Sequence, residues 1–301
     1  MMTGNALWNE YELILRSEKT YMKESHRQLK ILLKEFDRVC AKYHLEYYLS
    51  CGSLIGAVRH GDFIPWDDDA DVAMTRENYE KLKSHASEVW NGSEFTFLPY
   101  DKLGNSTFLD FLNRLVYQKE TIQTNIFYRV KDRMRADVCD HQVLDIYVLD
   151  NASDDEKKHK MHCLKQKIIY GLAMGHRGKI DMSLYKSVPP FVQRAVWWLS
   201  HIGKAIPLPL LFKIYERHCK RFYNKKTACY YESNGWINFF SHKIRKDLLL
   251  ETCRLQIDDI SVMAPKRYDD FLEDHGYHNY MSYPPAYDRK PKHSAKSDLI
   301  L

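Results

Sequence analysis

Four carboxylates occupy five consecutive positions early in the chain. The run DDDAD at residues 67–71 lies between apolar stretches on both sides. If the run is a β-strand, its side chains alternate between two faces, so Asp67, Asp69 and Asp71 project together. Asp68 then faces away. Three such carboxylates repel one another unless a divalent cation neutralises them, and oxygen ligands suit Mg²⁺ or Mn²⁺. The alternative is a solvated acidic loop, which the apolar flanks disfavour.

A further carboxylate lies within a very apolar stretch. Asp145 interrupts the sequence VLDIYV at residues 143–148, which is typical of a nearly buried strand. An unpaired charge in such a strand costs several kcal/mol, so Asp145 needs a partner. That partner is either a basic side chain or helix N-terminus, or the metal of the acidic run. Three carboxylates around Mg²⁺ would serve phosphoryl transfer, with a spare carboxylate accepting the proton of an attacking hydroxyl.

A Gly-Ser pair precedes the acidic run. Gly52 and Ser53 follow a predicted strand at 45–49 and precede a predicted short helix at 54–60. Backbone N–H groups and a hydroxyl in this position can hold a phosphate. The pair alone is a weak signal. The order strand, Gly-Ser, helix and Asp-x-Asp is, however, that of nucleotidyltransferase-fold active sites.

Helical patterns on both sides of these residues predict the elements that position them. Apolar residues recur at helical spacing from Glu18 to Tyr43, which predicts an amphipathic helix packed on the core. Thr75 is the expected N-cap of a helix that ends near residue 89. Ser153 opens a capping box for a helix that ends near Met174.

Strand patterns complete the expected fold. Further strands are predicted at 95–98, 108–117 and 143–149, and the tail from residue 284 is expected to be irregular. The sequence therefore predicts an α+β protein with a nucleotidyltransferase-like mixed β-sheet flanked by helices and a mainly helical C-terminal half. We expect a catalytic core with an N-terminal helix at 1–150, and a helical, basic region at 151–301.

The composition excludes several classes of protein. The chain has 301 residues, of which 45% are hydrophobic and 28% are charged, and this balance excludes disorder, collagen-like repeats and coiled coils. No uncharged apolar run approaches the roughly 18 residues that a membrane span needs. The first residues lack the apolar core of a signal peptide. The seven cysteines form no CxxC pair, which disfavours disulfide and zinc frameworks. We therefore expect a cytoplasmic protein.

A basic segment contrasts with the otherwise acidic chain. Between Lys157 and Lys226 there are 16 Lys and Arg residues but only two acids, Asp181 and Glu216, whereas the net charge of the whole chain is +5. Helices are expected at 191–206 and after two prolines at 210–223. Two core-packed helices with a solvated basic face would explain this pattern. The functional alternative is peripheral contact with anionic lipid at the inner membrane face. No nucleic-acid-binding module is recognised, so nucleic acid is not an expected partner.

Three stretches of the chain resemble the LicD family of phosphocholine transferases, whose fukutin and fukutin-related members transfer ribitol phosphate. The longest is YYLSCGSLIGAVRHGDFIPWDDDADVAMTRENYEKL at residues 47–82. The other two are VLDIYVLD at 143–150 and MAPKRYDDFLEDHGYHNYMSYPP at 263–285. The resemblance covers most of the chain, with a variable middle, and it implies that the last of these stretches, in the region 151–301, completes the donor and acceptor site.

The resemblance implies a role for each carboxylate. Asp69 and Asp71 would bind Mg²⁺ or Mn²⁺, and Asp145 would supply the third carboxylate. Asp67 would be an extra ligand or the base for the acceptor hydroxyl. Family members use a CDP-linked alcohol as donor and release CMP. The acceptor would be a hydroxyl of a cell-surface glycan or teichoic-acid precursor, typically lipid-linked, as in lipopolysaccharide modification.

The resemblance also implies the residues that contact the donor. Gly52 and Ser53 would hold the nucleotide phosphate, and Arg59 and His60 match the family's RH pair, with phosphate contact as the functional interpretation and helix capping as the alternative. Choline would need aromatic faces for its quaternary ammonium, and Trp66 beside the acids is the first candidate. Core packing is the alternative for every aromatic residue. The further candidates are Tyr47, Tyr48, Trp236 and Tyr283.

These observations predict a metal-dependent transferase that moves phosphocholine from CDP-choline, or a similar phospho-alcohol, to a glycan. One alternative keeps the fold and uses CDP-ribitol, CDP-glycerol or a nucleoside triphosphate. An alternative of another class is a catalytically idle scaffold associated with a membrane.

Overall fold

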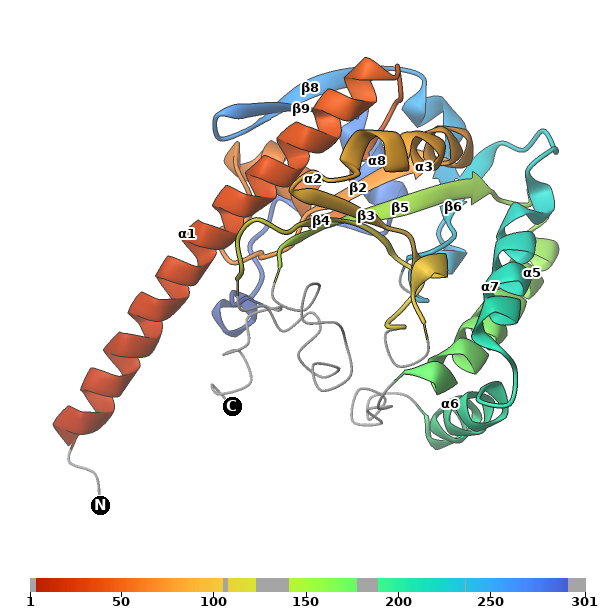
Figure 1. Cartoon of the computed structure of the whole chain (residues 1–301), viewed down its shortest axis with the longest axis horizontal. Helices are drawn as coiled ribbons and strands as arrows, with labels where there is room; N and C mark the ends of the chain where they lie inside the picture. The colour runs from red at the N-terminus through yellow and green to blue at the C-terminus, as the bar shows by residue number, and fades with distance from the viewer. Residues whose placement is uncertain (1–3, 105–107, 123–140, 178–188, 236, 292–301) are drawn as a thin grey trace.

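The computed structural model describes residues 4–104, 108–122, 141–177, 189–235 and 237–291. Its centre is a mixed, seven-stranded sheet with helices around it (Figure 1). The strands, in chain order, are β1 (Tyr48–Leu49), β2 (Asp71–Thr75), β3 (Phe95–Leu98), β4 (Asn113–Tyr117), β5 (Val143–Asn151), β6 (Cys229–Glu232) and β7 (Ile244–Arg245). An antiparallel hairpin of β8 (Thr252–Ile257) and β9 (Ile260–Pro265) forms a separate sheet.

The pairing of the strands places the predicted carboxylates together. The spatial order is β1-β2-β5-β4-β3, and β6 continues from the far end of β5. The central pair β2 and β5 is parallel, with Asp71 in register with Asp145, while the other pairs of the sheet are antiparallel. Both central strands are buried throughout most of their length, as expected for strands covered on two faces.

Seven α-helices of the described chain surround these sheets. The long α1 (Gly4–Lys42) crosses the molecule, and its N-terminal part projects beyond the body (Figure 1). Its buried stripe of Leu29, Leu32, Leu33 and Phe36 confirms the predicted amphipathic helix. The remaining helices are α2 (Cys51–His60), α3 (Arg76–Trp90), α5 (Glu156–Ala173), α6 (Pro190–Gly203), α7 (Leu208–Cys219) and α8 (Tyr268–Asp274).

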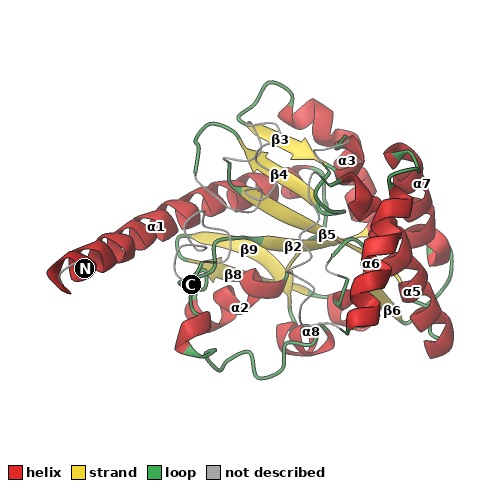
Figure 2. Cartoon of the chain, turned by 90° about the horizontal axis from the view of Figure 1, so that it is seen from below, coloured by secondary structure: helices red, strands yellow, loops and turns green. Residues whose placement is uncertain are grey.

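The described structure has two hydrophobic cores. The larger lies between the sheet, the N-terminal helices and the β8–β9 hairpin. The smaller joins Phe108 and Phe111 to the α5–α7 helices, and the ring of Phe111 stacks on Tyr215 with centroids 3.6 Å apart. Figure 2 shows α5, α6 and α7 grouped at one end of the molecule. This group is the predicted basic segment.

A buried ion pair fastens α7 to the sheet. Arg76, at the start of α3, donates to both carboxylate oxygens of Asp150 on β5, at 2.5 and 3.0 Å. The same guanidinium donates to Glu216 of α7 at 2.9 Å. The Arg76 and Asp150 side chains are buried, so each needs the other to offset the cost of leaving water.

The α+β prediction is confirmed, as are the sheet with flanking helices and several element boundaries. The Oγ1 of Thr75 accepts the backbone N–H of Asn78 at the start of α3, as a cap should. The predicted cap at Ser153 is wrong, because α5 begins at Glu156 and Asp155 accepts the N–H of Lys158. The C-terminal half also contributes β6 to β9, which the helical patterns did not indicate. The division at residue 150 stays a prediction.

Candidate active site

The acidic run is a loop that leads into β2. The strand begins only at Asp71, so the predicted strand alternation over residues 67–70 is wrong. Backbone bonds hold the loop instead: the carbonyl of Ala70 accepts the N–H of Asp145 at 2.9 Å. On the other side, the carbonyl of Asp71 accepts the N–H of Ser50 at 3.1 Å. The loop is thus clamped between β5 and the start of α2.

The four predicted carboxylates nevertheless form one electrostatic cluster. Asp71 and Asp145 lie side by side on the two parallel strands and are 5% and 9% exposed. Burial raises the pKa of Asp71 well above its usual range, and the nearby charges of Asp69, Asp145 and Asp67 raise it further. Asp67 and Asp69 are only partly buried, so the cluster opens to solvent on their side.

Asp68 points away from this cluster, as predicted. Its side chain is fully buried, and its Oδ2 accepts the hydroxyl proton of Tyr21 on α1 at 2.9 Å. Its backbone carbonyl accepts the side-chain amide of Gln142 at 2.7 Å. Asp68 therefore ties the loop to α1 and to the residue before β5.

Asp145 has a basic partner, which is one of the two partners the sequence leaves open. Arg114 of β4 lies opposite Asp145, and its Nε is 2.9 Å from the Asp145 carboxylate. The same guanidinium donates to both oxygens of Asp110 at 2.9 Å. Burial acts to raise the pKa of Asp110, but the Arg114 charge outweighs it and the pKa is lowered. Arg114 thus fixes the position of Asp145 at the edge of the cluster.

Gly52 and Ser53 lie in the first turn of α2, which begins three residues earlier than predicted. The positive φ of 48° belongs to Cys51, so Gly52 does not form the expected turn. The glycine serves close approach instead, since a Cβ added there would lie 2.1 Å from Oδ2 of Asp67. The Ser53 hydroxyl accepts the backbone N–H of Asp71 at 2.8 Å. Both residues therefore hold the acidic cluster in place.

An aromatic cage lies beside the acids. We use this name for Trp66, Tyr283 and His60, whose ring centroids lie 5.6 to 6.3 Å from one another. The guanidinium carbon of Arg289 lies 5.7 Å from the centroid of Trp66 and 5.2 Å from that of Tyr283. The cage thus binds a cation from this chain's own C-terminal segment.

Arg59 holds the C-terminal segment against α2. Its Nη1 donates to the carbonyls of Tyr280 and Ser282, at 2.5 and 3.1 Å, and its guanidinium lies 5.0 Å from the ring of Tyr283. Burial lowers the pKa of Arg59, while the Tyr283 and Asp67 charges oppose that shift. Helix capping does not describe these contacts. The predicted phosphate contacts of Arg59 and His60 stay a prediction.

A buried Glu–His pair beside Asp71 escaped the sequence analysis. Glu232 of β6 and His275 are each 1% exposed, and their side chains are 2.7 Å apart. The Ser50 hydroxyl also donates to Glu232 at 3.5 Å, and the Glu232 charge contributes to the raised pKa of Asp71. The only sequence signal was an acid in the stretch YYES at 230–233.

The donor chemistry of the cluster suits a hard divalent cation. Within the described ranges, no three His, Cys, Asp or Glu side chains converge tightly enough to coordinate one ion. The four carboxylates nevertheless act on one another electrostatically, and a cation is the charge that would relieve this repulsion. Mg²⁺ or Mn²⁺ binding at Asp69, Asp71 and Asp145 therefore stays a prediction that the donor set fits.

Comparison with known proteins supports the same region. Residues 44–164, which carry the Gly-Ser pair, the acidic run and Asp145, match the family model described as LicD/FKTN/FKRP, nucleotidyltransferase domain. These residues form a LicD-family domain. The predicted resemblance is therefore confirmed.

Individual relatives are similar to this chain as well, and one of them is similar well beyond the LicD-family domain. The lipopolysaccharide cholinephosphotransferase LicD of Haemophilus influenzae is 26% identical over 296 residues, which cover 89% of this chain and 94% of that protein. The ribitol 5-phosphate transferase FKRP of Mus musculus is 50% identical over 42 residues, 13% of this chain and 8% of that protein. An uncharacterised protein of Rickettsia prowazekii is 32% identical over 81 residues, 23% of this chain and 30% of that protein. The prediction of a LicD-type transferase is confirmed.

The remaining aromatic candidates differ in their outcome. Tyr47 and Tyr48 are buried in the main core, so they cannot line a choline site. Tyr283 joins Trp66 in the cage. Trp236 lies outside the described residues. The described cysteines are all free, and no described helix has the length and apolarity to cross a bilayer.

Proposed function

We propose that this LicD-type transferase moves phosphocholine, or a phospho-alcohol with a similar cationic head, from a CDP-alcohol donor to a hydroxyl of a glycan acceptor. The observation that carries the choice of donor is the aromatic cage, which already binds a guanidinium next to the acidic cluster. Cation–π attraction selects a charged head over a neutral polyol of similar size. Trp66 adjoins Asp67 in the chain, so a head in the cage would bring its phosphate to the acids.

The residues of the cluster would divide the reaction between them. The acceptor oxygen forms a bond to the phosphorus that carries choline, and the bond from that phosphorus to the CMP oxygen breaks. Asp67 is partly exposed and packs on Gly52, where it would accept the proton of the acceptor hydroxyl. Asp69, Asp71 and Asp145 would hold Mg²⁺ or Mn²⁺, which when bound offsets the charge of the pyrophosphate. Arg59 would orient the donor from the other side of Asp67.

A neutral donor is the nearest alternative, because one relative with a short match to this chain is named a ribitol 5-phosphate transferase, and ribitol is an uncharged polyol. A triphosphate donor would keep the same cluster. A catalytically idle scaffold would need none of the carboxylates. Each of these alternatives gives a different result in one assay.

The test is CMP release by the purified chain with Mg²⁺ or Mn²⁺. The donors are CDP-choline, CDP-ethanolamine, CDP-ribitol, CDP-glycerol, ATP and CTP, with Asp69→Asn and Asp145→Asn as site variants. Asp68→Asn is the matched control, since it makes the same change in the same loop on a side chain that faces α1. We expect release from the cationic donors, lost in both site variants and kept in the control. Release from a neutral donor alone would overturn the choice of donor. Absence of both binding and turnover would favour the scaffold.

A further inference from the structure

The three helices at the end of the molecule expose an unusual face. On α5, the apolar side chains of Met161, Leu164 and Ile168 recur along one exposed stripe, between the exposed Lys160 and Lys165. A stripe of this kind on a surface helix normally faces a core. Here it faces solvent.

The helix α6 rests on the same side of α5 and is more exposed still. Gly171 follows Ile168 in the α5 stripe, and a Cβ added to it would contact the side chain of Leu199 on α6. A Cβ added to Gly203 of α6 would likewise meet the backbone of α5. Figure 2 shows the two helices packed together. The exposed apolar residues of α6 therefore lie next to those of α5. Its exposed apolar residues include Phe191 (71%), Trp197 (42%), Trp198 (60%) and Ile202 (55%).

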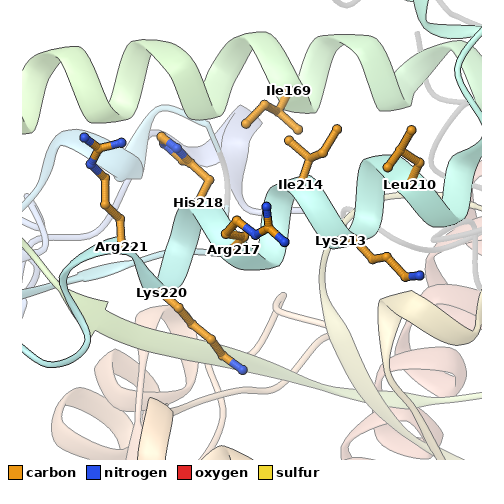
Figure 3. Close-up of a pocket in the computed structure, with 8 residues that line it drawn as sticks. All are labelled: Ile169, Leu210, Lys213, Ile214, Arg217, His218, Lys220 and Arg221. Atoms are coloured by element: carbon orange, nitrogen blue, oxygen red, sulfur yellow. The ribbon is translucent and has the colours of Figure 1, made fainter.

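A cleft of about 720 Å³ lies along α7 and reaches Ile169 of α5, and its lining is both apolar and basic. Figure 3 shows Leu210 and Ile214 of α7 directed toward Ile169 of α5. The charged side chains around them are all basic. The cations that line the cleft are Lys213, Arg217, Lys220 and Arg221.

Among the described residues, only one of these four cations has an acidic partner: Lys220, whose Nζ lies 2.6 Å from Glu80 and 2.8 Å from Glu216. Glu216 faces inward, where it accepts from Arg76 and Tyr100 and pairs with Lys220. Within the described part of the chain, no carboxylate lies within ion-pair distance of Lys213 or Arg217. The face therefore combines exposed indole and aliphatic groups with uncompensated positive charge.

From this combination we infer that the outer face of α5, α6 and α7 docks onto an anionic lipid bilayer. Indole rings favour the boundary between headgroups and acyl chains, and lysine and arginine favour the negative headgroups. An acidic protein would satisfy the charges but would leave most of the aliphatic groups without a partner. The inference does not depend on the identity of the donor, because none of these residues belongs to the acidic cluster or the aromatic cage.

Vesicle flotation with the full chain tests this inference. The vesicles are pure phosphatidylcholine, or phosphatidylcholine with a third of phosphatidylglycerol, at two salt concentrations. The variants are Lys213→Glu/Arg217→Glu and Trp198→Glu. The matched control is Lys81→Glu/Lys119→Glu, which makes the same change of charge on exposed lysines of α3 and of the segment after β4.

We expect the wild-type chain and the control to float with the anionic vesicles and to remain behind with the neutral ones. Each cation near such a surface contributes about a fivefold gain in partitioning, so the double charge reversal should lower it by at least about 25-fold. CMP release in solution should be unchanged. Equal flotation of all variants, or no flotation with anionic vesicles, would overturn the inference. Binding to polyglutamate without binding to vesicles would assign the face to an acidic protein instead.

Discussion

The cation already present in the aromatic cage makes a quantitative prediction about substrate affinity. Arg289 lies over Trp66 and Tyr283, so a cationic donor must displace it before using the same rings. Each contact contributes about 0.5–1 kcal/mol at an exposed site, so the two together hold Arg289 in place by about 1–2 kcal/mol. The Nε of Arg289 also donates to the carbonyl of Pro284 at 2.8 Å, within the same segment.

Removing this internal competitor should strengthen donor binding. In Arg289→Ala the cage loses this cation, while Arg59 keeps its place beside Tyr283. A gain of about 1–2 kcal/mol corresponds to an apparent KM for CDP-choline that is about 5–30-fold lower. The KM for a neutral donor such as CDP-glycerol should not change. Initial rates of CMP release over a range of donor concentrations measure both values.

Two further variants separate competition from other effects of the substitution. Lys290→Ala removes one positive charge from the neighbouring position and should leave both KM values unchanged. Trp66→Leu removes one wall of the cage and should raise the KM for CDP-choline while sparing CDP-glycerol. If Arg289→Ala raises the KM for CDP-choline, or lowers the KM of both donors equally, the cage is not a site for the donor's cationic head.

Three other predictions follow from contacts in the fold. In Gly52→Ala the new Cβ would displace the Asp67 carboxylate, so CMP release should fall about 100-fold with an unchanged circular dichroism spectrum. Arg76→Met leaves Asp150 buried without a cation, so urea unfolding should show a loss of about 3–5 kcal/mol in the free energy of unfolding. Burial and neighbouring basic groups lower the pKa of His162 to about 3. As the pH falls below about 6.5, His162 therefore becomes protonated in the unfolded chain while it stays neutral in the folded chain. Between pH 7 and pH 5 the wild type should therefore lose about 2 kcal/mol more stability than His162→Gln does.

Each of these predictions has an outcome that contradicts it. Wild-type rates in Gly52→Ala would mean that Asp67 tolerates displacement. For Arg76→Met, the comparison is Lys81→Met, which removes an exposed i,i+4 pair with Glu77 and should cost less than about 1 kcal/mol. Equal losses in the free energy of unfolding for Arg76→Met and Lys81→Met would show that the buried Arg76–Asp150 pair is no stronger than the exposed Lys81–Glu77 pair. Parallel pH profiles of wild type and His162→Gln would remove His162 as the source of acid sensitivity.

Local sequence patterns predicted those helices and strands that depend mainly on residues close together in the chain. The helix capped by Thr75, the strand β3 and the apolar strand β5 all follow from residues within a few positions of each other. The predicted start of β2 was wrong because a strand extends only as far as its pairing, and the pairing of β2 with β5 begins at Asp71. The sequence of residues 67–71 contains no pattern that marks where this pairing begins.

The sequence predicted that the carboxylates form one cluster, but it did not predict the residues that support them. The catalytic and metal-binding roles of these carboxylates stay predictions. The carboxylates were found because acids among apolar residues are conspicuous. Arg114 and Glu232 were missed, since each becomes significant only through a partner on a distant strand. A sequence pattern does not reveal which distant residues become partners. For the same reason it did not predict that the guanidinium of Arg289 lies in the aromatic cage.

The contact between Arg59 and Tyr280 spans 221 residues, and this separation has a consequence for synthesis. At 5–20 residues per second, a ribosome needs about 10–45 s to extend the chain from one partner to the other. For most of that interval the nascent chain carries its acidic run but lacks β6, which is complete only at Glu232. The Glu232–His275 pair forms only near the end of the interval, and Tyr283 of the aromatic cage follows after it. The enzyme therefore matures only near the end of translation, and a chain released before residue 280 would carry the LicD-family domain without a complete aromatic cage.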